Sequence, residues 1–474
     1  MNQSGSTTVT DSPQNNRRQI SRRDFLRLAG LTGAAALGTQ AAFSPLNARL
    51  TIESDAAGRH PRPWWVRTVQ KPTIEIDWDR MKRFDARDTV RSGGMIKYVD
   101  EMEYDRLTNV EALNEKQRIL DEVPGYTLQD QALNVAQHHA ILGRLSFLGP
   151  QRAPTPEARG VAKWNGTPEE ASRILRTAMR QFGAATVGFV ELDEKTHKLI
   201  YSHDPDGKQL VFEDVEEGSE SVEKRVIPNK AQWVVVYTVQ MSRESVKRAP
   251  TALAEQATNS AYIRGALIQD QTQEFLRGLG YQGLGQATVN ALGIAPAFAV
   301  MAGLGELSRL NRLITPEYGP MVRVFFLVTD LPLATDQPID AGIIEFCKKC
   351  KKCAEACPPS ALSLEDEPTW EVRGGWNNPG HKAFFEDSVK CRTYMMEQAG
   401  TNCGICFAVC PFSKPDKAWI HKFVKATIST APVADGFIRS MDDAFSYGAQ
   451  KNPTTWWSLD LPEFGIDTQR TVKE

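Results

Sequence analysis

The feature that most constrains this chain is the placement of its cysteines. All eight lie between Cys347 and Cys410 of a 474-residue sequence. The first run, Cys347 to Cys357, has the spacing Cys-x2-Cys-x2-Cys-x3-Cys-Pro; the second, Cys403 to Cys410, has Cys-x2-Cys-x3-Cys-Pro, with Cys391 upstream. A disulfide scaffold does not suit this length, because a long chain can bury a core without covalent staples. The spacing therefore indicates ligation of a metal or cluster.

The first run has the ligand spacing of bacterial ferredoxins, in which three thiolates hold one [4Fe–4S] cluster and the fourth, before proline, ligates another. The second run lacks its usual first cysteine, and Cys391 is the one left for that role. Zinc ribbons are the alternative, but their ligand spacing differs. We expect two clusters with crossed ligand sets: Cys347, Cys350, Cys353 and Cys410 in the first set, and Cys357, Cys391, Cys403 and Cys406 in the second set.

The N-terminus has the pattern of an export signal. Arg22 and Arg23 precede a weakly apolar run from Leu28 to Ala42 that is rich in Gly, Ala and Thr. Paired arginines before such a run are typical of a twin-arginine signal, whereas a membrane anchor needs about 20 strongly apolar residues. The twin-arginine route moves folded proteins, so cofactors can be inserted before export. We assign residues 1–45 to the signal, and the net charge of −2 gives no electrostatic reason to expect nucleic acid.

The middle of the chain predicts an α/β domain over residues 166–335. Apolar, β-branched runs at 186–192, 233–240 and 321–331 are typical of buried strands. Residues 168–182 and 251–279 have helical spacing. Glycines are concentrated from Gly278 to Gly305, which indicates either close backbone approach to a large flat ligand or a tightly packed loop bundle.

Three polar residues of this domain have apolar neighbours. Arg323 interrupts the expected strand, where a charge is costly unless it is paired or faces a polar pocket. Asn290 lies in a short apolar stretch, and Tyr262 lies on the expected helix. Taken singly, each also fits an ordinary structural role: an ion pair for Arg323 and packing for Tyr262.

Several segments together resemble the respiratory reductive dehalogenases. They are the paired-arginine signal, Pro63-Trp64-Trp65, Glu75-Ile76-Asp77-Trp78, Gly303-Leu304-Gly305-Glu306, Pro316-Glu317-Tyr318-Gly319-Pro320, Val328-Thr329-Asp330-Leu331-Pro332-Leu333 and both cysteine runs. The cysteine motif alone is shared with many ferredoxins, but its combination with the other segments is specific and spans nearly the whole chain.

The resemblance implies an α+β fold with a nitroreductase-like α/β corrinoid-binding core and a ferredoxin-like domain for two [4Fe–4S] clusters. The implied units are the signal, a wrapping segment at 46–165, the core at 166–335, the cluster domain at 336–420 and a C-terminal segment at 421–474 that packs on the core. It implies catalytic roles for Tyr262 as proton donor, Arg323 beside it and Asn290 in the pocket. We also assign corrinoid contacts to Gly303, Gly305 and Ser308.

The implied activity is reductive removal of halogen, chloride foremost, from a small organohalide as the terminal step of organohalide respiration. Electrons would enter at the cluster held partly by Cys391, pass to the one held partly by Cys347, and reduce the corrinoid cobalt to Co(I). The resemblance implies a corrinoid bound base-off without a histidine ligand to cobalt, and the sequence fits this, because none of its seven histidines lies in an Asp-x-His-x-x-Gly string. Implied partners are an upstream electron donor and a small integral-membrane anchor protein, at the outer face of the cytoplasmic membrane.

An apolar pocket is expected for such a substrate. The tryptophans are candidates to line it, although most tryptophans are core residues: Trp64, Trp65, Trp370, Trp376, Trp456 and Trp457.

Three other functions remain. A corrinoid iron–sulfur reductase of a modified tRNA base (epoxyqueuosine) shares the cofactors but works in the cytosol, so the export signal speaks against it. A non-catalytic iron–sulfur electron carrier would contain no corrinoid. An anchor subunit of a membrane complex would need spanning helices.

Replacing Arg22 and Arg23 with lysine tests the export assignment. Because the twin-arginine machinery requires the arginine pair, the double variant should accumulate in the cytoplasm as an unprocessed precursor that already contains iron. Fractionation, immunoblotting and iron analysis measure this. Normal processing of the double variant would contradict the assignment.

Overall fold

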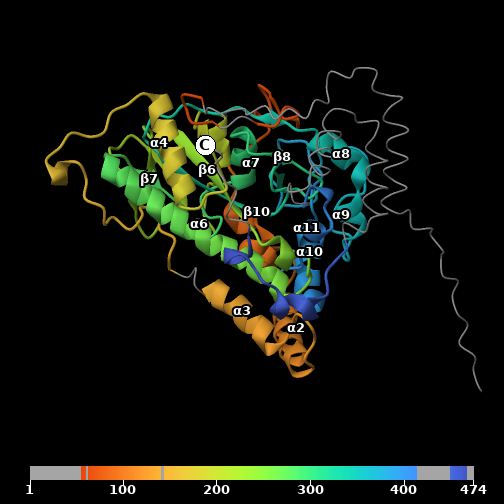
Figure 1. The fold of residues 1–474 in the computed structure, drawn as a ribbon. Coiled ribbons are helices and arrows are strands. Elements are labelled where there is room, and N and C mark those ends of the chain that lie inside the picture. Colours follow the sequence, from red (N-terminus) through yellow and green to blue (C-terminus); the bar gives the residue numbers. More distant parts are fainter. Residues whose placement is uncertain (1–54, 60–61, 140–142, 414–448, 467–474) are drawn as a thin grey trace, which may run out of the picture.

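The computed structural model describes residues 55–59, 62–139, 143–413 and 449–466. The expected signal at 1–45 lies outside these residues. At the centre is a four-stranded sheet in the order β2 (Thr186–Glu191), β6 (Trp233–Gln240), β10 (Val322–Thr329) and β7 (Gly283–Leu284), and every neighbouring pair is antiparallel (Figure 1). The three strands expected from apolar runs are confirmed.

These strands are apolar along their whole length because both faces of the sheet are covered. Tyr237 and Phe325 are register partners that point to the face covered by α6 (Ala252–Leu279) and α4 (Pro168–Gln181). Val236 and Phe326 point to the opposite face, where Phe298 of α7 (Ala295–Met301) packs on them. Continuous apolar runs are common in parallel sheets, and the same double burial produces them in this antiparallel one.

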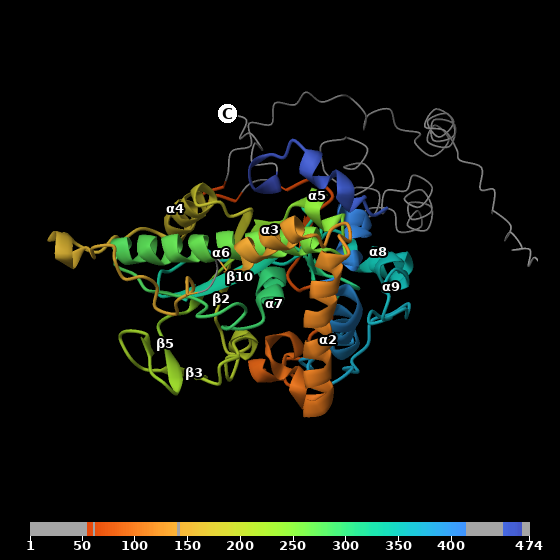
Figure 2. The same ribbon diagram turned by 90° about the horizontal axis from the view of Figure 1, so that it is seen from below.

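The long helix α6 connects the sheet to the rest of the molecule (Figures 1 and 2). The Thr251 side chain accepts a hydrogen bond from the Ala254 amide at its start, and Gly280 ends it with a left-handed φ of 91°. Gly265 lets the helix approach the sheet, because a Cβ there would lie 2.1 Å from the Phe325 ring. The expected helices at 168–182 and 251–279 are therefore confirmed to within one residue at each end.

Smaller strands and single turns surround this core. The strands are β1 (Arg67–Thr68) paired with β11 (Ile339–Asp340), β8 (Glu306–Leu307) with β9 (Leu313–Ile314), and a three-stranded sheet of β3 (Gln209–Glu213), β5 (Lys224–Pro228) and β4 (Ser219–Glu220). The short helices are η1 (Ala86–Asp88), η2 (Val90–Ser92), η3 (Gly94–Lys97), η4 (Glu157–Arg159), η5 (Thr196–Leu199) and α5 (Arg243–Val246).

The cysteine segment forms short helices on one side of the core: α8 (Ile343–Cys350), α9 (Lys352–Glu355), α10 (Ser388–Tyr394), the π-turn η6 (Met395–Ala399), α11 (Ile405–Ala408) and η7 (Pro411–Ser413). Helix α2 (Glu101–Leu120) runs beside η6, and α3 (Leu128–His139) packs along α6 (Figure 2). The segment before the core thus touches both α6 and the cysteine segment.

Residues 449–466 contain η9 (Pro453–Ser458) and η10 (Glu463–Gly465) and lie on the core. Trp456 is buried beneath the Arg248 guanidinium, and the Trp457 indole donates a hydrogen bond to Asp130 at 2.8 Å. Among the described helices, none combines the length and apolarity that a membrane span requires.

Candidate active site

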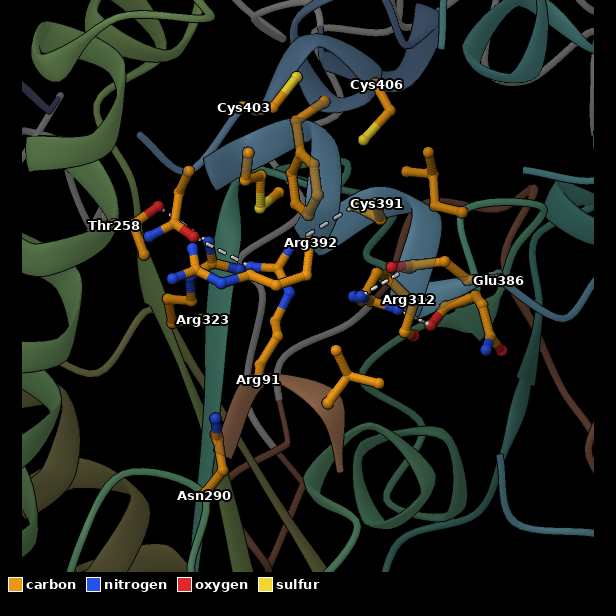
Figure 3. A pocket seen from close by; sticks show the side chains of 18 of the residues that line it. Arg91, Thr258, Asn290, Arg312, Arg323, Glu386, Cys391, Arg392, Cys403 and Cys406 are labelled. Atoms are coloured by element: carbon orange, nitrogen blue, oxygen red, sulfur yellow. Dashed lines mark hydrogen bonds and ion pairs between the residues drawn. The ribbon is translucent and has the colours of Figure 1, made fainter. Parts of the chain in front are cut away.

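A cavity of about 920 Å³ lies between α6, β10 and the cysteine segment. Figure 3 shows Cys403 and Cys406 at one end of it and Asn290 at the other, with arginine side chains between them. The three catalytic residues expected from the sequence, Tyr262, Asn290 and Arg323, all belong to its lining. Residues from four distant parts of the chain therefore face one space.

Tyr262 projects from α6 at the sheet side of the cavity. Its ring meets the Phe325 ring edge-on, with 5.7 Å between centroids, which fixes the direction of the phenol. The hydroxyl accepts a hydrogen bond from the Asn290 side-chain amide at 3.4 Å. Asn290 has a left-handed φ of 59°, a conformation that asparagine tolerates better than most residues. The Asn290 amide thus contacts the phenol oxygen within the cavity.

Arg323 lies on β10 with its guanidinium beside Tyr262. One Nη2–H donates to the Thr258 hydroxyl at 2.8 Å, and the guanidinium carbon lies 5.6 Å from the Tyr262 ring centroid and 5.5 Å from that of Phe407. Burial lowers the pKa of Arg323, while Tyr262 opposes that shift. A guanidinium stays protonated even so. The buried Nε–H has no hydrogen-bond partner among the described residues, so the side chain keeps a donor available to a bound group.

The two expected cysteine sets lie around two different cavities. Cys357, Cys391, Cys403 and Cys406 belong to the lining of the large cavity, whereas Cys347, Cys350, Cys353 and Cys410 line a separate, small one. Burial raises the pKa of Cys347 and of Cys391 to about 12, so an iron cation is needed to favour the thiolate form. No three acidic, histidine or cysteine side chains of the described chain are grouped to hold one metal ion, but in a cubane each cysteine ligates its own iron.

This placement differs from the arrangement that underlies the expected order of electron transfer, in which the cluster held partly by Cys347 is the one next to the core. The set containing Cys391, not the set containing Cys347, shares the cavity with Tyr262. Motif spacing assigns ligands to clusters, but it carries no information on which cluster lies nearer the core, because that depends on how the segment docks.

Several charged residues of the site have no sequence signal. Arg91 comes from the wrapping segment, Arg312 pairs with Glu386 at 2.6 Å, and Arg392 pairs with Glu111 at 3.2 Å. Outside the large cavity, buried Arg309 donates to the carbonyls of Cys347 at 2.8 Å and Ser363 at 2.6 Å, which holds the first cysteine set in place. These contacts join segments that are far apart in the sequence, so no local sequence pattern predicts them.

The expected corrinoid contacts lie behind the cavity wall. A Cβ at Gly303 would meet the Gln337 carbonyl and one at Gly305 the Ile314 carbonyl, while the Ser308 hydroxyl donates to the Arg312 carbonyl at 2.8 Å. None of these three is among the lining residues, although Leu310 to Leu313 are. Their role as corrinoid contacts stays a prediction.

Of the six candidate tryptophans, the cavity lining contains Trp376. Trp64 and Trp457 are exposed, and Trp456 is buried in the C-terminal segment.

Two family models match the chain. One is described as a reductive dehalogenase subunit and covers residues 61–333; the other is a 4Fe-4S double cluster binding domain and covers residues 346–413. The chain belongs to the reductive dehalogenase family. As a family member it is an oxidoreductase that acts on carbon–halogen bonds and carries a double-cluster domain. The resemblance inferred from the sequence is confirmed, and so is the α+β fold class.

Named relatives support the same assignment of this reductive dehalogenase. A trichloroethene reductive dehalogenase of Dehalococcoides mccartyi is 30% identical over 94% of this chain and 97% of its own length. A tetrachloroethene reductive dehalogenase of Sulfurospirillum multivorans is 36% identical over 63% of this chain and 61% of its own. An epoxyqueuosine reductase of Lactococcus garvieae is 28% identical over 26% of this chain.

Among solved structures, a reductive dehalogenase described as B12-dependent shares the fold, with a TM-score of 0.61 and 24% identity. The match covers 81% of this chain and 49% of that one, so this chain spans about half the length of that protein.

Cys391→Ala tests the crossed ligand sets. One thiolate of the cavity set is lost, so that cluster should be lost or altered, and a protein with about eight iron atoms should keep about four to seven. Iron analysis and electron paramagnetic resonance of the anaerobic protein measure this. Cys347→Ala is the matched control and should affect the other cluster. Unchanged iron content and spectra in Cys391→Ala would remove Cys391 from the ligands.

Proposed function

We propose that the protein is a corrinoid-dependent reductive dehalogenase that removes halogen, chloride foremost, from a small organohalide as the terminal step of organohalide respiration. The observation that supports this best is a single cavity in which Tyr262 and Arg323 face the cysteines of one expected cluster. A proton donor and an electron source on opposite sides of one space are what a reductive replacement of halogen by hydrogen requires.

The residues present fit a corrinoid. The cavity has room for a large planar group, with a volume of about 920 Å³, and the unpartnered Arg323 Nε–H offers it a donor. When bound, the corrinoid supplies a low-valent cobalt that reduces the carbon–halogen bond, while the protein orients the reactants and excludes water. The proposed base-off form follows the family resemblance, and no histidine of the sequence lies in an Asp-x-His-x-x-Gly string that would offer a ligand to cobalt.

Tyr262 is proposed as the proton donor. The Arg323 guanidinium carbon lies 5.6 Å from the Tyr262 ring centroid. This positive charge stabilises the anion that remains after proton transfer. The Asn290 amide, which donates to the same oxygen, adds a second stabilising contact.

Tyr201 is a less suitable proton donor. It also lines the cavity, but burial raises its pKa, with Tyr262 adding to the shift.

The proposed electron path reverses the order expected from the sequence. Cys347, Cys350, Cys353 and Cys410 would hold the cluster that accepts electrons from an upstream donor, and the cavity set would hold the cluster that supplies them at the cavity. The supporting observation is that the cavity set alone, among the described cysteines, shares a space with Tyr262.

We further propose export by the twin-arginine route and peripheral attachment to the outer face of the cytoplasmic membrane. The paired Arg22 and Arg23 support the route. The partners proposed with this location are the upstream electron donor and a small integral-membrane anchor protein, and nucleic acid is not a proposed partner.

Tyr262→Phe tests the proton-donor role, because it keeps the ring and removes the hydroxyl. Turnover of a substrate that exchanges halogen for hydrogen, such as trichloroethene, should fall by roughly 10²–10⁴, the usual scale for a positioned general acid. A vicinal dihalide loses two halogens without needing a proton, so its turnover should fall least. Both rates are measured on one preparation with unchanged cobalt and iron content.

Tyr201→Phe is the matched control, since Tyr201 lines the same cavity. It should leave the ratio of the two rates unchanged. Full trichloroethene turnover in a fully loaded Tyr262→Phe protein would exclude Tyr262 as the donor.

A further inference from the structure

Arg91 reaches from the wrapping segment to a cysteine of the cavity set. Its Nη2 lies 3.7 Å from the Cys391 sulfur at hydrogen-bond geometry, and its Nη1 donates to the Asn402 side-chain oxygen at 3.1 Å. Asn402 immediately precedes Cys403, another cysteine of the same set. The Arg91 guanidinium therefore contacts one expected ligand, Cys391, and the residue next to another, Cys403 (Figure 3).

The backbone around Arg91 is anchored rather than loose. Val90 and Met95 are 3% and 1% exposed and pack with Leu107 and Met396, and Met396 lies on the turn that follows the Cys391 helix. Gly94 allows the tight turn, because a Cβ there would lie 2.4 Å from the Arg87 carbonyl. The position of Arg91 is therefore tied to the cysteine segment itself.

The guanidinium of Arg91 forms its hydrogen bonds with the Cys391 sulfur and the Asn402 amide oxygen, and the Glu386 carboxylate also interacts with its charge. Among the other arginines that line the cavity, Arg312 pairs with Glu386 and Arg392 with Glu111. Within the described part of the chain, no carboxylate forms an ion pair with Arg91. Hydrogen bonds to cluster sulfurs and nearby charge are two of the levers that set the potential of an iron–sulfur cluster.

We propose that Arg91 raises the reduction potential of the cluster ligated by Cys391. When one electron passes from the Cys347 cluster, the cavity cluster gains one negative charge, no bond is made or broken, and the Cys347 cluster is reoxidised. A fixed cation beside a ligand sulfur stabilises the more negative state, so it favours residence of the electron next to the cavity. This inference rests on the proposed ligation by Cys391.

Through Arg91, the wrapping segment would influence the reduction potential of the cavity cluster. The docking of η2 against the cysteine segment places the charge. Arg91 is a tuning residue, because it acts through the cluster rather than on substrate.

The test is a potentiometric titration of the anaerobic, cofactor-loaded protein followed by electron paramagnetic resonance. In Arg91→Met, reduction of one cluster should become at least tenfold less favourable, a shift of about 59 mV to more negative potential for one electron. The potential of the other cluster should stay unchanged. Arg91→Lys keeps the charge, so its reduction equilibrium should stay within about threefold of the wild type.

Arg87→Met is the matched control. Arg87 lies on the same segment but pairs with Asp85 and does not line the cavity, so both potentials should be unchanged. If Arg91→Met fails to retain the cluster, Arg91→Gln, which keeps amide donors and removes the charge, should show the same negative shift.

The outcomes separate this inference from the function on which it rests. Unchanged potentials in an Arg91 variant with wild-type iron content would overturn the role of Arg91 and leave the proposed function intact. Loss of neither cluster in Cys391→Ala would instead overturn the ligation that both require.

Discussion

The exchange of cysteines between the two runs is the constraint on which the rest of the structure depends. Cys357 leaves the first run to face the large cavity with Cys391, whereas Cys410 leaves the second run to join Cys347. Two cubanes bound in this way would cross-link the first cysteine run to the second. The segment is also fixed to the core, because Arg309 donates to the Cys347 carbonyl and Asn402 donates to Glu255 of α6. The cysteine segment that forms the wall of the cavity is therefore held to the core by side-chain hydrogen bonds.

On the sheet side of the cavity, the buried position of Arg323 on β10 strengthens the effect of its charge on neighbouring groups. Arg323 is part of a strand whose neighbours are buried on both faces, so its charge meets water chiefly through the cavity. A guanidinium in such surroundings acts strongly on nearby groups, since little solvent screens it. The Tyr262 phenol, held by Phe325 and Asn290, is the group within its reach that can release a proton. Burial thus has two effects: it imposes a desolvation cost on the Arg323 guanidinium, and it strengthens the electrostatic effect of that charge on the Tyr262 phenol.

The sequence predicts features that depend on neighbouring residues, but it does not predict contacts between distant segments. The central strands and α6 follow from apolar periodicity, and crossed ligand sets follow from a motif shorter than 70 residues. A charge within an apolar run points to Arg323, and the order of Tyr262 and Arg323 resembles that of the family. The antiparallel pairing, the cluster nearer the cavity and the contact of Arg91 with Cys391 depend on how distant segments dock; that last contact spans 300 positions.

The most direct test of the account is the metal content of the anaerobically purified, mature protein, measured together with chloride release from a chlorinated ethene and a reduced donor. The account predicts about one cobalt for about eight iron atoms, with chloride release that requires both metals. A protein with full iron content, no cobalt and no chloride release after incubation with a corrinoid would be an electron carrier, and the account would be wrong.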